Sequence, residues 1–266
     1  VPVEADGSAL FRIPANTPIS LQPLDAEGKA LQLMRSWLVG MPGETVSCVG
    51  CHEEHQSQTP VSLPTLAARK LPSEIAPWHG PPRNFSFQRE VQPVLDRYCV
   101  GCHGGTAESS EPDLRGTVLT SDFQSKLYGH GHIKGGRFFS VGYFELSRRV
   151  RRPGIESDIR LLQPAEYHAD TTELVRILRQ GHHGVSLDAE SWDRLITWID
   201  LNAPYHGTWT EMGWDPGRQR ERRRELLKLY AGRDEDPESL ASVPVPTSPP
   251  AVPNDGVNRT PSKSAS

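Results

Sequence analysis

A five-residue motif occurs twice in this chain and uses all of its cysteines. Residues 99–103 read Cys-Val-Gly-Cys-His, and residues 48–52 repeat the same five letters. Cys-x-x-Cys-His is the attachment motif of c-type haem, in which two thiols bind the porphyrin and the histidine binds the iron. The sequence therefore predicts two covalently attached haem c groups. The residues that would hold them are Cys48, Cys51, His52, Cys99, Cys102 and His103.

Other uses of paired cysteines fit this pattern less well. A zinc ribbon separates its two Cys-x-x-Cys pairs by roughly 15–20 residues, whereas the stretch between Cys51 and Cys99 is much longer. A thioredoxin-like redox pair needs no histidine at the next position and would rarely occur twice. Structural disulfides do not explain the repeat either. A haemless zinc-binding interaction module is the alternative from another class of protein.

The composition bears on the size of the core and on location. Hydrophobic residues make up 36% of the chain, beside 23 glycines and 24 prolines, which predicts many loops and a small core. The net charge of −4 gives no indication of nucleic-acid binding. No apolar run reaches the roughly 18 residues of a membrane helix, and no signal peptide precedes Val1. Because bacteria attach c-type haem outside the cytoplasm, we expect a mature fragment or the C-terminal part of a periplasmic or otherwise exported protein.

Changes in sequence pattern divide the chain into five segments. Residues 1–47 alternate apolar and polar side chains between turn signals, which predicts the end of a β-sandwich-like middle domain. Residues 48–83 hold the first haem motif and a proline-rich connector, and residues 84–210 form a second haem domain. Residues 211–240 contain a charged helix, and residues 241–266 are expected to be disordered. The predicted fold class is mainly α with extensive loops, like a dihaem cytochrome c, preceded by a short β segment from a truncated β domain.

Helical spacing is clearest directly before the second motif and near the C-terminus. Apolar residues recur at helical spacing over residues 91–98, and Pro93 within that stretch predicts a kink or a late start. Residues 218–231 form a second, arginine-rich helix. For residues 104–165 we expect loops with short helices, because glycines and serines interrupt the apolar runs.

Two further helices carry capping signals. Asp170 and Glu173 are spaced as a capping box, and the helix that they begin should end at Gly181. Asp188 is expected to cap the next helix, whose apolar residues follow an i, i+3, i+4, i+7 pattern.

The second axial ligand of each iron decides whether a haem transfers electrons or binds a substrate. For the second haem we favour His182 or His183, which lie at the end of a predicted helix in the same unit as Cys99. His168 is the next candidate. His130 and His132 are less favoured because they lie in a glycine-rich segment.

The first haem has fewer candidate distal ligands. His79, in the connector, is one of them, and an open iron site is the other possibility. His55 lies too near His52 to reach the opposite porphyrin face, so it faces solvent or binds an additional metal ion such as zinc or calcium. His206 is expected to be a packing or capping residue rather than a haem ligand. Met34 and Met41 are expected to pack in the core rather than to bind iron.

Several stretches around the motifs match those of one known family. They are residues 6–9, 14–18, 34–37, 42–45, 47–52, 91–96, 181–183, 192–195 and 198–202. In these stretches the chain resembles the hydrazine synthase alpha subunit and its relatives. The similarity covers most of residues 1–235 and is most specific around the first motif.

The resemblance implies an N-terminal β-propeller and a middle β domain, followed by a C-terminal region with two c-type haems. It implies one bis-histidine haem, in which His182 or His183 lies opposite His103. It also implies a less ordinary first haem, near which the family performs chemistry on ammonia and a nitrogen-oxide-derived intermediate. In that family a tyrosine four residues after the motif histidine binds the iron, whereas this chain has Gln56 there.

These observations together predict a dihaem c-type cytochrome region that carries electrons within a larger periplasmic oxidoreductase. The alternative is a catalytic first haem that acts on a small nitrogen compound. The expected partners are a redox protein or other subunits of a multihaem complex.

Overall fold

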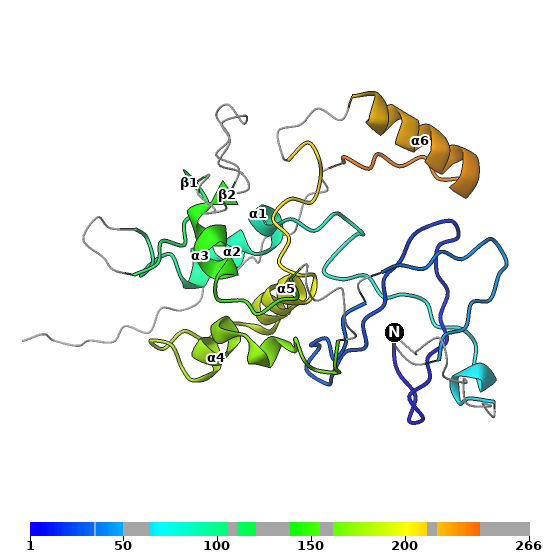
Figure 1. Cartoon of the computed structure of the whole chain (residues 1–266), viewed down its shortest axis with the longest axis horizontal. Helices are drawn as coiled ribbons and strands as arrows, with labels where there is room; N and C mark the ends of the chain where they lie inside the picture. Colours follow the sequence, from blue (N-terminus) through cyan, green and yellow to red (C-terminus); the bar gives the residue numbers. More distant parts are fainter. Residues whose placement is uncertain are drawn as a thin grey trace, which may run out of the picture.

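Short helices joined by long loops make up the computed structural model of this chain (Figure 1). The structure describes residues 1–34, 36–49, 64–105, 111–120, 139–154, 162–211 and 217–239. Its elements in chain order are η1 (Ala67–Arg69), α1 (Phe87–Glu90), α2 (Gln92–Tyr98), β1 (Leu119–Thr120), β2 (Phe139–Ser140), α3 (Val141–Ser147), η3 (Ala169–Thr171), α4 (Glu173–Arg179), α5 (Ala189–Asp200) and α6 (Arg218–Ala231). Helices α1 to α5 gather on one side, the N-terminal loops lie on the other, and α6 stands at the edge. None of the helices described here has the length and apolar character needed to span a bilayer.

The N-terminal segment pairs through isolated bridges in place of the expected strands. Its described bridges are Phe11 with Ser73, Ile19 with Leu38, and Leu24 with Ala30. Pro14, Pro18 and Pro23 interrupt the first half of this segment. Proline has no N–H to donate to a ladder, so pairing does not extend from these bridges into longer strands. Elsewhere, β1 and β2 pair antiparallel over two residues each.

One apolar core holds the helices together. Its buried members are Phe87, Val91, Val94, Leu95, Leu114, Tyr143, Leu146, Val150, Ala169, Leu174, Val175, Leu195, Ile196, Trp198, Ile199, Ala203 and Tyr205. Trp198 of α5 lies at its centre with no exposed surface, and its ring centroid is 5.3 Å from that of Phe87 in α1. Its indole N–H donates to the Pro204 carbonyl at 3.0 Å. Aromatic pairs at such distances add to the stability that burial of apolar area already provides.

Three of the helix predictions are confirmed. The Asp188 side chain accepts the Ser191 N–H at 2.7 Å, so Asp188 caps α5 as expected. The predicted range 218–231 coincides with α6. The expected break before the second motif lies at Val91, since α1 ends before it and α2 begins after it. Pro93 occupies the first turn of α2, where its missing N–H costs no intrahelical bond.

The capping box predicted at Asp170 and Glu173 is wrong. Asp170 lies in η3, and Thr172 is the N-cap residue of α4. The Asp170 carboxylate instead accepts from Lys29 Nζ and Arg179 Nη1, each at 3.1 Å. Two cationic side chains outcompete one backbone N–H for the carboxylate, because charge-assisted hydrogen bonds are the stronger ones.

A buried ion cluster joins the N-terminal segment to the helices. Lys29 is only 3% exposed, and its Nζ lies 3.1 Å from Asp170 and 3.6 Å from Asp25. His168 Nε2 lies 2.9 Å from Asp25 Oδ2. Burial alone would raise the pKa of Asp25, but hydrogen bonds from the Lys29 N–H and His168, together with the Lys29 charge, hold it at about 2.

Asp200, at the end of α5, completes this junction. Its Oδ2 accepts the Ala30 N–H at 2.8 Å, and its backbone carbonyl accepts from Gln22 Nε2 at 2.8 Å. Burial, with the nearby charge of Asp25, raises the pKa of Asp200 to about 6, although the Ala30 N–H, His168 and Lys29 act in the opposite direction. The carboxyl is therefore protonated in the folded protein at pH values where the unfolded chain has lost that proton.

This difference predicts how stability depends on pH. Between the unfolded pKa of 3.8 and the folded value of about 6, the folded state binds the extra proton, so the Asp200 contribution to stability falls as pH rises. Asp200→Asn keeps an acceptor for the Ala30 N–H and removes this titration. We expect the free energy of unfolding of the wild type, minus that of the variant, to fall by about 2 to 3 kcal/mol between about pH 4 and pH 7. Urea unfolding over this pH range measures the difference, and parallel curves for the two proteins would contradict it.

Candidate haem site

The second cysteine motif continues directly from helix α2. The Cys99 N–H donates to the Leu95 carbonyl at 2.8 Å, and the N–H groups of Cys102 and His103 both donate to the Cys99 carbonyl, at 3.1 and 2.9 Å. These bonds fold residues 99–103 into a tight turn at the end of the helix. Cys99 packs against the helical core, and Cys102 is exposed. Burial, with smaller contributions from Cys102 and Asp96, raises the pKa of the Cys99 thiol to about 11.

His103 is held in a defined orientation by the loop that follows the motif. Its Nδ1 lies 3.2 Å from the Pro112 carbonyl oxygen, to which an Nδ1–H donates, and its own carbonyl accepts the Leu114 N–H at 2.9 Å. When one imidazole nitrogen donates to a backbone carbonyl, the other is left unprotonated and able to bind a metal. The geometry thus leaves Nε2 of His103 as the nitrogen that is able to bind a metal.

His182 lies opposite His103 with its ring nearly parallel. The two ring centroids are 5.8 Å apart and the ring planes differ by 12°. Imidazole nitrogens bind first-row metals at about 2 Å, so one metal held between two rings separates their centroids by about 6 Å. Burial and the charges of His183 and His103 lower the pKa of His182, which favours the neutral form that can ligate. The pair therefore has the spacing of two axial ligands.

The loop after α4 determines which of the two adjacent histidines faces His103. Gly181 has φ +88° and His183 has φ +47°, so the chain turns sharply on both sides of His182. The His183 ring lies edge-on to the His182 ring, with centroids 4.7 Å apart and planes at 81°. The structure brings His182 to His103 and leaves His183 beside it.

The first motif lies mostly outside the described residues. Cys48 is described and exposed, whereas Cys51 and His52 fall outside. His55, His130 and His132 also lie outside the described part of the chain. Their predicted roles as ligands stay predictions.

The other candidate histidines have different partners. His79 Nε2 lies 2.6 Å from Asp193 Oδ2, and His168 Nε2 bonds to Asp25. The His206 ring packs on Tyr205, with centroids 4.6 Å apart. Met34 Sδ accepts the Leu21 N–H at 3.3 Å, and Met41 is exposed. Of the described histidines, only His182 has its ring stacked on that of His103.

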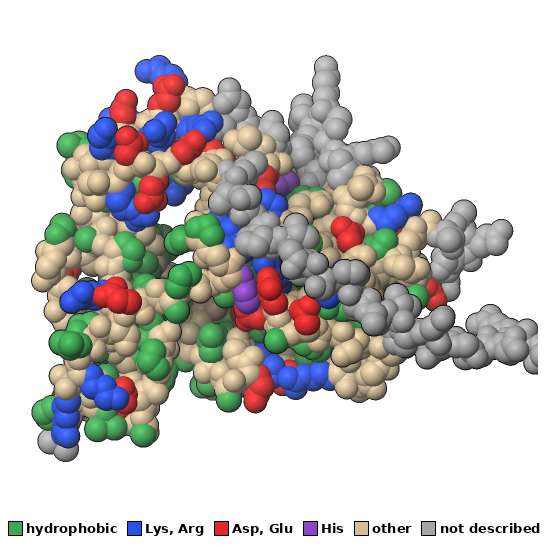
Figure 2. Space-filling model, turned by 180° about the vertical axis from the view of Figure 1, so that it is seen from behind, with side chains coloured by type: hydrophobic (Ala, Val, Ile, Leu, Met, Phe, Trp, Pro, Cys, Tyr) green, Lys and Arg blue, Asp and Glu red, His purple; other side chains and the backbone are tan. Residues whose placement is uncertain are grey.

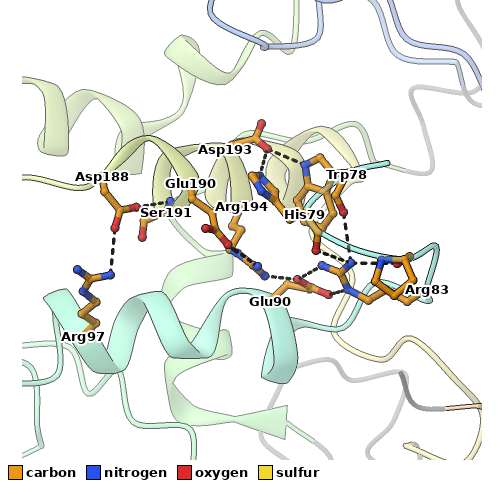
Figure 3. A network of polar contacts seen from close by, with 11 residues as sticks. Trp78, His79, Arg83, Glu90, Arg97, Asp188, Glu190, Ser191, Asp193 and Arg194 are labelled. Carbon is orange, nitrogen blue, oxygen red and sulfur yellow. Dashed lines mark hydrogen bonds and ion pairs between the residues drawn. The ribbon is translucent and has the colours of Figure 1, made fainter. Parts of the chain in front are cut away.

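The sequence analysis did not predict the buried network of charged side chains that joins α1, α5 and the connector, shown in Figure 3. Glu90 has no exposed surface and accepts from Arg83 Nε at 2.6 Å and from Arg194 of α5. Arg194 also pairs with Glu190 at 2.6 Å. Arg83 donates to the His79 carbonyl at 3.0 Å, which fixes the connector against α1. A signal for this network was available, because Glu90 shares the apolar helix stripe of Phe87, Val91 and Val94.

The connector is fixed at a second point. Asp193 Oδ2 accepts from Trp78 Nε1 at 2.6 Å as well as contacting His79. The Arg83 guanidinium lies over the Trp78 ring, 5.2 Å from its centroid, and Arg194 lies 5.7 Å from it. His79 thus has a structural partner in the described structure, in addition to its predicted role at the first haem.

Within the described residues, no group of three or more His, Cys, Asp or Glu side chains is arranged to hold a metal ion. The additional zinc or calcium ion therefore has no candidate site there. The paired imidazoles of His103 and His182 would hold a metal that brings its own equatorial ligands, as a porphyrin does.

One comparison with known proteins gives a match. Residues 1–53 match the family model of the hydrazine synthase alpha subunit middle domain. Neither a curated protein nor a solved structure matches the chain. The match supports the relation to hydrazine synthase alpha in the N-terminal segment and does not extend to the second motif or to His182.

Proposed function

We propose that residues 84–210 form a c-type haem domain whose haem is attached through Cys99 and Cys102. In this proposal His103 and His182 would be the two protein ligands of its iron. The observation that carries the proposal is the pair of nearly parallel rings 5.8 Å apart, one of which belongs to a Cys-x-x-Cys-His motif. The contact of His103 Nδ1 with the Pro112 carbonyl supports it, because it leaves Nε2 as the nitrogen free to bind a metal.

Electron transfer is the function that this ligand set supports best. The haem would supply a one-electron redox centre. If both His103 and His182 bound its iron, the haem would have no coordination site left for a substrate. The apolar packing of Cys99 against the core places one side of the site away from water, and burial is one of the factors that set the redox potential.

The wider setting follows from the N-terminal segment. Residues 1–53 resemble a domain of hydrazine synthase alpha, and the first motif lies at their end. We place this chain in a larger, exported, hydrazine synthase alpha-like oxidoreductase that carries a second haem c on Cys48 and Cys51. Its partners would be a redox protein or other subunits of a multihaem complex. Export is inferred from the motif, since bacteria attach c-type haem outside the cytoplasm.

Mass spectrometry of the full chain tests the proposal directly. Protein from a bacterial host that matures c-type cytochromes should gain the mass of two haems and show a sharp α band when reduced. The Cys99→Ser/Cys102→Ser variant should lose one haem, and the Cys48→Ser/Cys51→Ser variant should lose the other. An unmodified wild-type mass, or bound zinc in place of haem, would overturn the proposal.

A further inference from the structure

Helix α6 is attached to the molecule along only part of its surface. It is 14 residues long, has no buried residue and stands at the edge of the molecule in Figure 1. Two contacts connect its C-terminal end to the N-terminal segment: Asn16 Nδ2 donates to the Tyr230 carbonyl at 2.5 Å, and Arg233 Nη1 donates to Thr17 Oγ1 at 2.9 Å.

One face of α6 already binds an acidic stretch of this chain. Arg220 Nε donates to Asp236 at 2.9 Å, Arg224 Nη2 donates to Asp234 at 3.0 Å, and Lys228 lies 3.4 Å from Asp234. These three basic residues are four positions apart, so they form one row along the helix. Basic side chains of this helix thus pair with carboxylates of the segment that follows it.

The neighbouring face of α6 lines an open groove of about 700 Å³, with Asn16 on the far side. Its residues again follow helical spacing: Arg218, Arg222, Arg223, Leu226, Leu227 and Tyr230. None of the described residues that line the groove is an aspartate or a glutamate. Among the described residues Arg218 and Arg223 form no ion pair, and Arg222 has only the exposed Glu225, 3.3 Å away on its own helix. Figure 2 shows charged side chains gathered over this part of the molecule and a hollow beside them.

We propose that this groove is the docking site for an acidic segment of a partner protein that also carries apolar side chains. The arginines would pair with its carboxylates, and Leu226, Leu227 and Tyr230 would contact its apolar residues. A partner protein suits the groove better than an anionic membrane does, because basic residues of the same helix already bind carboxylates of a peptide segment, Asp234 and Asp236. Asn16 of the N-terminal segment lines the groove together with α6.

The test uses a fluorescein-labelled peptide with glutamate and leucine at helical spacing, as long as α6, and the full chain. Fluorescence anisotropy should show saturable binding that weakens with added salt. Arg223→Glu should reduce the affinity by about tenfold, and Leu226→Ser should also weaken binding. Arg69→Glu is the matched control, because it makes the same charge change at an exposed site on η1 and should change the affinity by less than about twofold.

Each outcome decides the proposal. Saturable binding that Arg223→Glu weakens and Arg69→Glu spares supports it. No saturable binding at about 1 mM protein, or equal losses in both variants, overturns it. Binding to phosphatidylglycerol vesicles without binding to the peptide also overturns it, since the groove would then serve a membrane surface. Circular dichroism of each variant confirms that α6 is still formed.

Discussion

Replacing His182 by alanine is expected to change one of the two proposed haems from low-spin to high-spin. His103 would then be the only axial protein ligand on that iron, because no other described histidine has its ring opposite His103. The absorption spectrum and electron paramagnetic resonance of the oxidised protein report the spin state of each haem. Carbon monoxide should bind one haem of the variant whose iron has no free coordination position in the wild type. Added imidazole should restore the low-spin spectrum.

His183→Ala is the matched control for this prediction. His183 is adjacent in sequence and contacts the His182 ring edge-on, so its removal changes the same loop without removing the facing imidazole. We expect both haems of this variant to keep their spin states. A high-spin haem in His183→Ala, with an unchanged spectrum in His182→Ala, would reverse the ligand assignment. If neither variant changes the spectrum, the distal ligand is another residue, and mass spectrometry still reports whether the haem is attached.

Replacing Glu90 by alanine is expected to cost about 3–5 kcal/mol of stability. Glu90 has no exposed surface, and the side chains of its partners Arg83 and Arg194 are only 3% and 2% exposed. Removal of the carboxylate leaves two buried guanidinium groups without their shared counter-charge. Glu190 and the backbone carbonyls that Arg83 reaches compensate only in part. Urea unfolding at neutral pH measures the loss.

The exposed pair between Arg12 and Glu74 provides the comparison. These side chains are 70% and 73% exposed, so Glu74→Ala should cost less than about 1 kcal/mol. Glu90→Gln keeps one acceptor oxygen and the side-chain volume, and we expect a loss between those of the two alanine variants. Similar losses in Glu90→Ala and Glu74→Ala would show that burial does not strengthen the network. Limited proteolysis should also find residues 78–83 more accessible in Glu90→Ala, because Arg83 fixes this connector.

The elements that the sequence predicted well are those that local interactions control. The cap of α5 at Asp188 and the range of α6 depend on residues within a few positions of one another. The break at Val91 follows equally from Pro93 in the next turn. The capping box at Asp170 failed because Lys29, distant in sequence, binds that carboxylate in the folded protein. The sequence shows Glu90 as an acidic residue within an apolar helix stripe. Its ion-pair partners, Arg83 and Arg194, could be identified only from the tertiary structure.

The sequence by itself predicted which residues would attach haem, because two thiols and a histidine within five residues form a local unit whatever the surrounding fold. It also related the N-terminal segment to hydrazine synthase alpha, which the family match over residues 1–53 supports. Only the tertiary structure decided that His182, rather than its neighbour, faces His103. The reason is physical: adjacent side chains share the same local pattern, and the left-handed turn at Gly181 and His183 determines which of them points across the site.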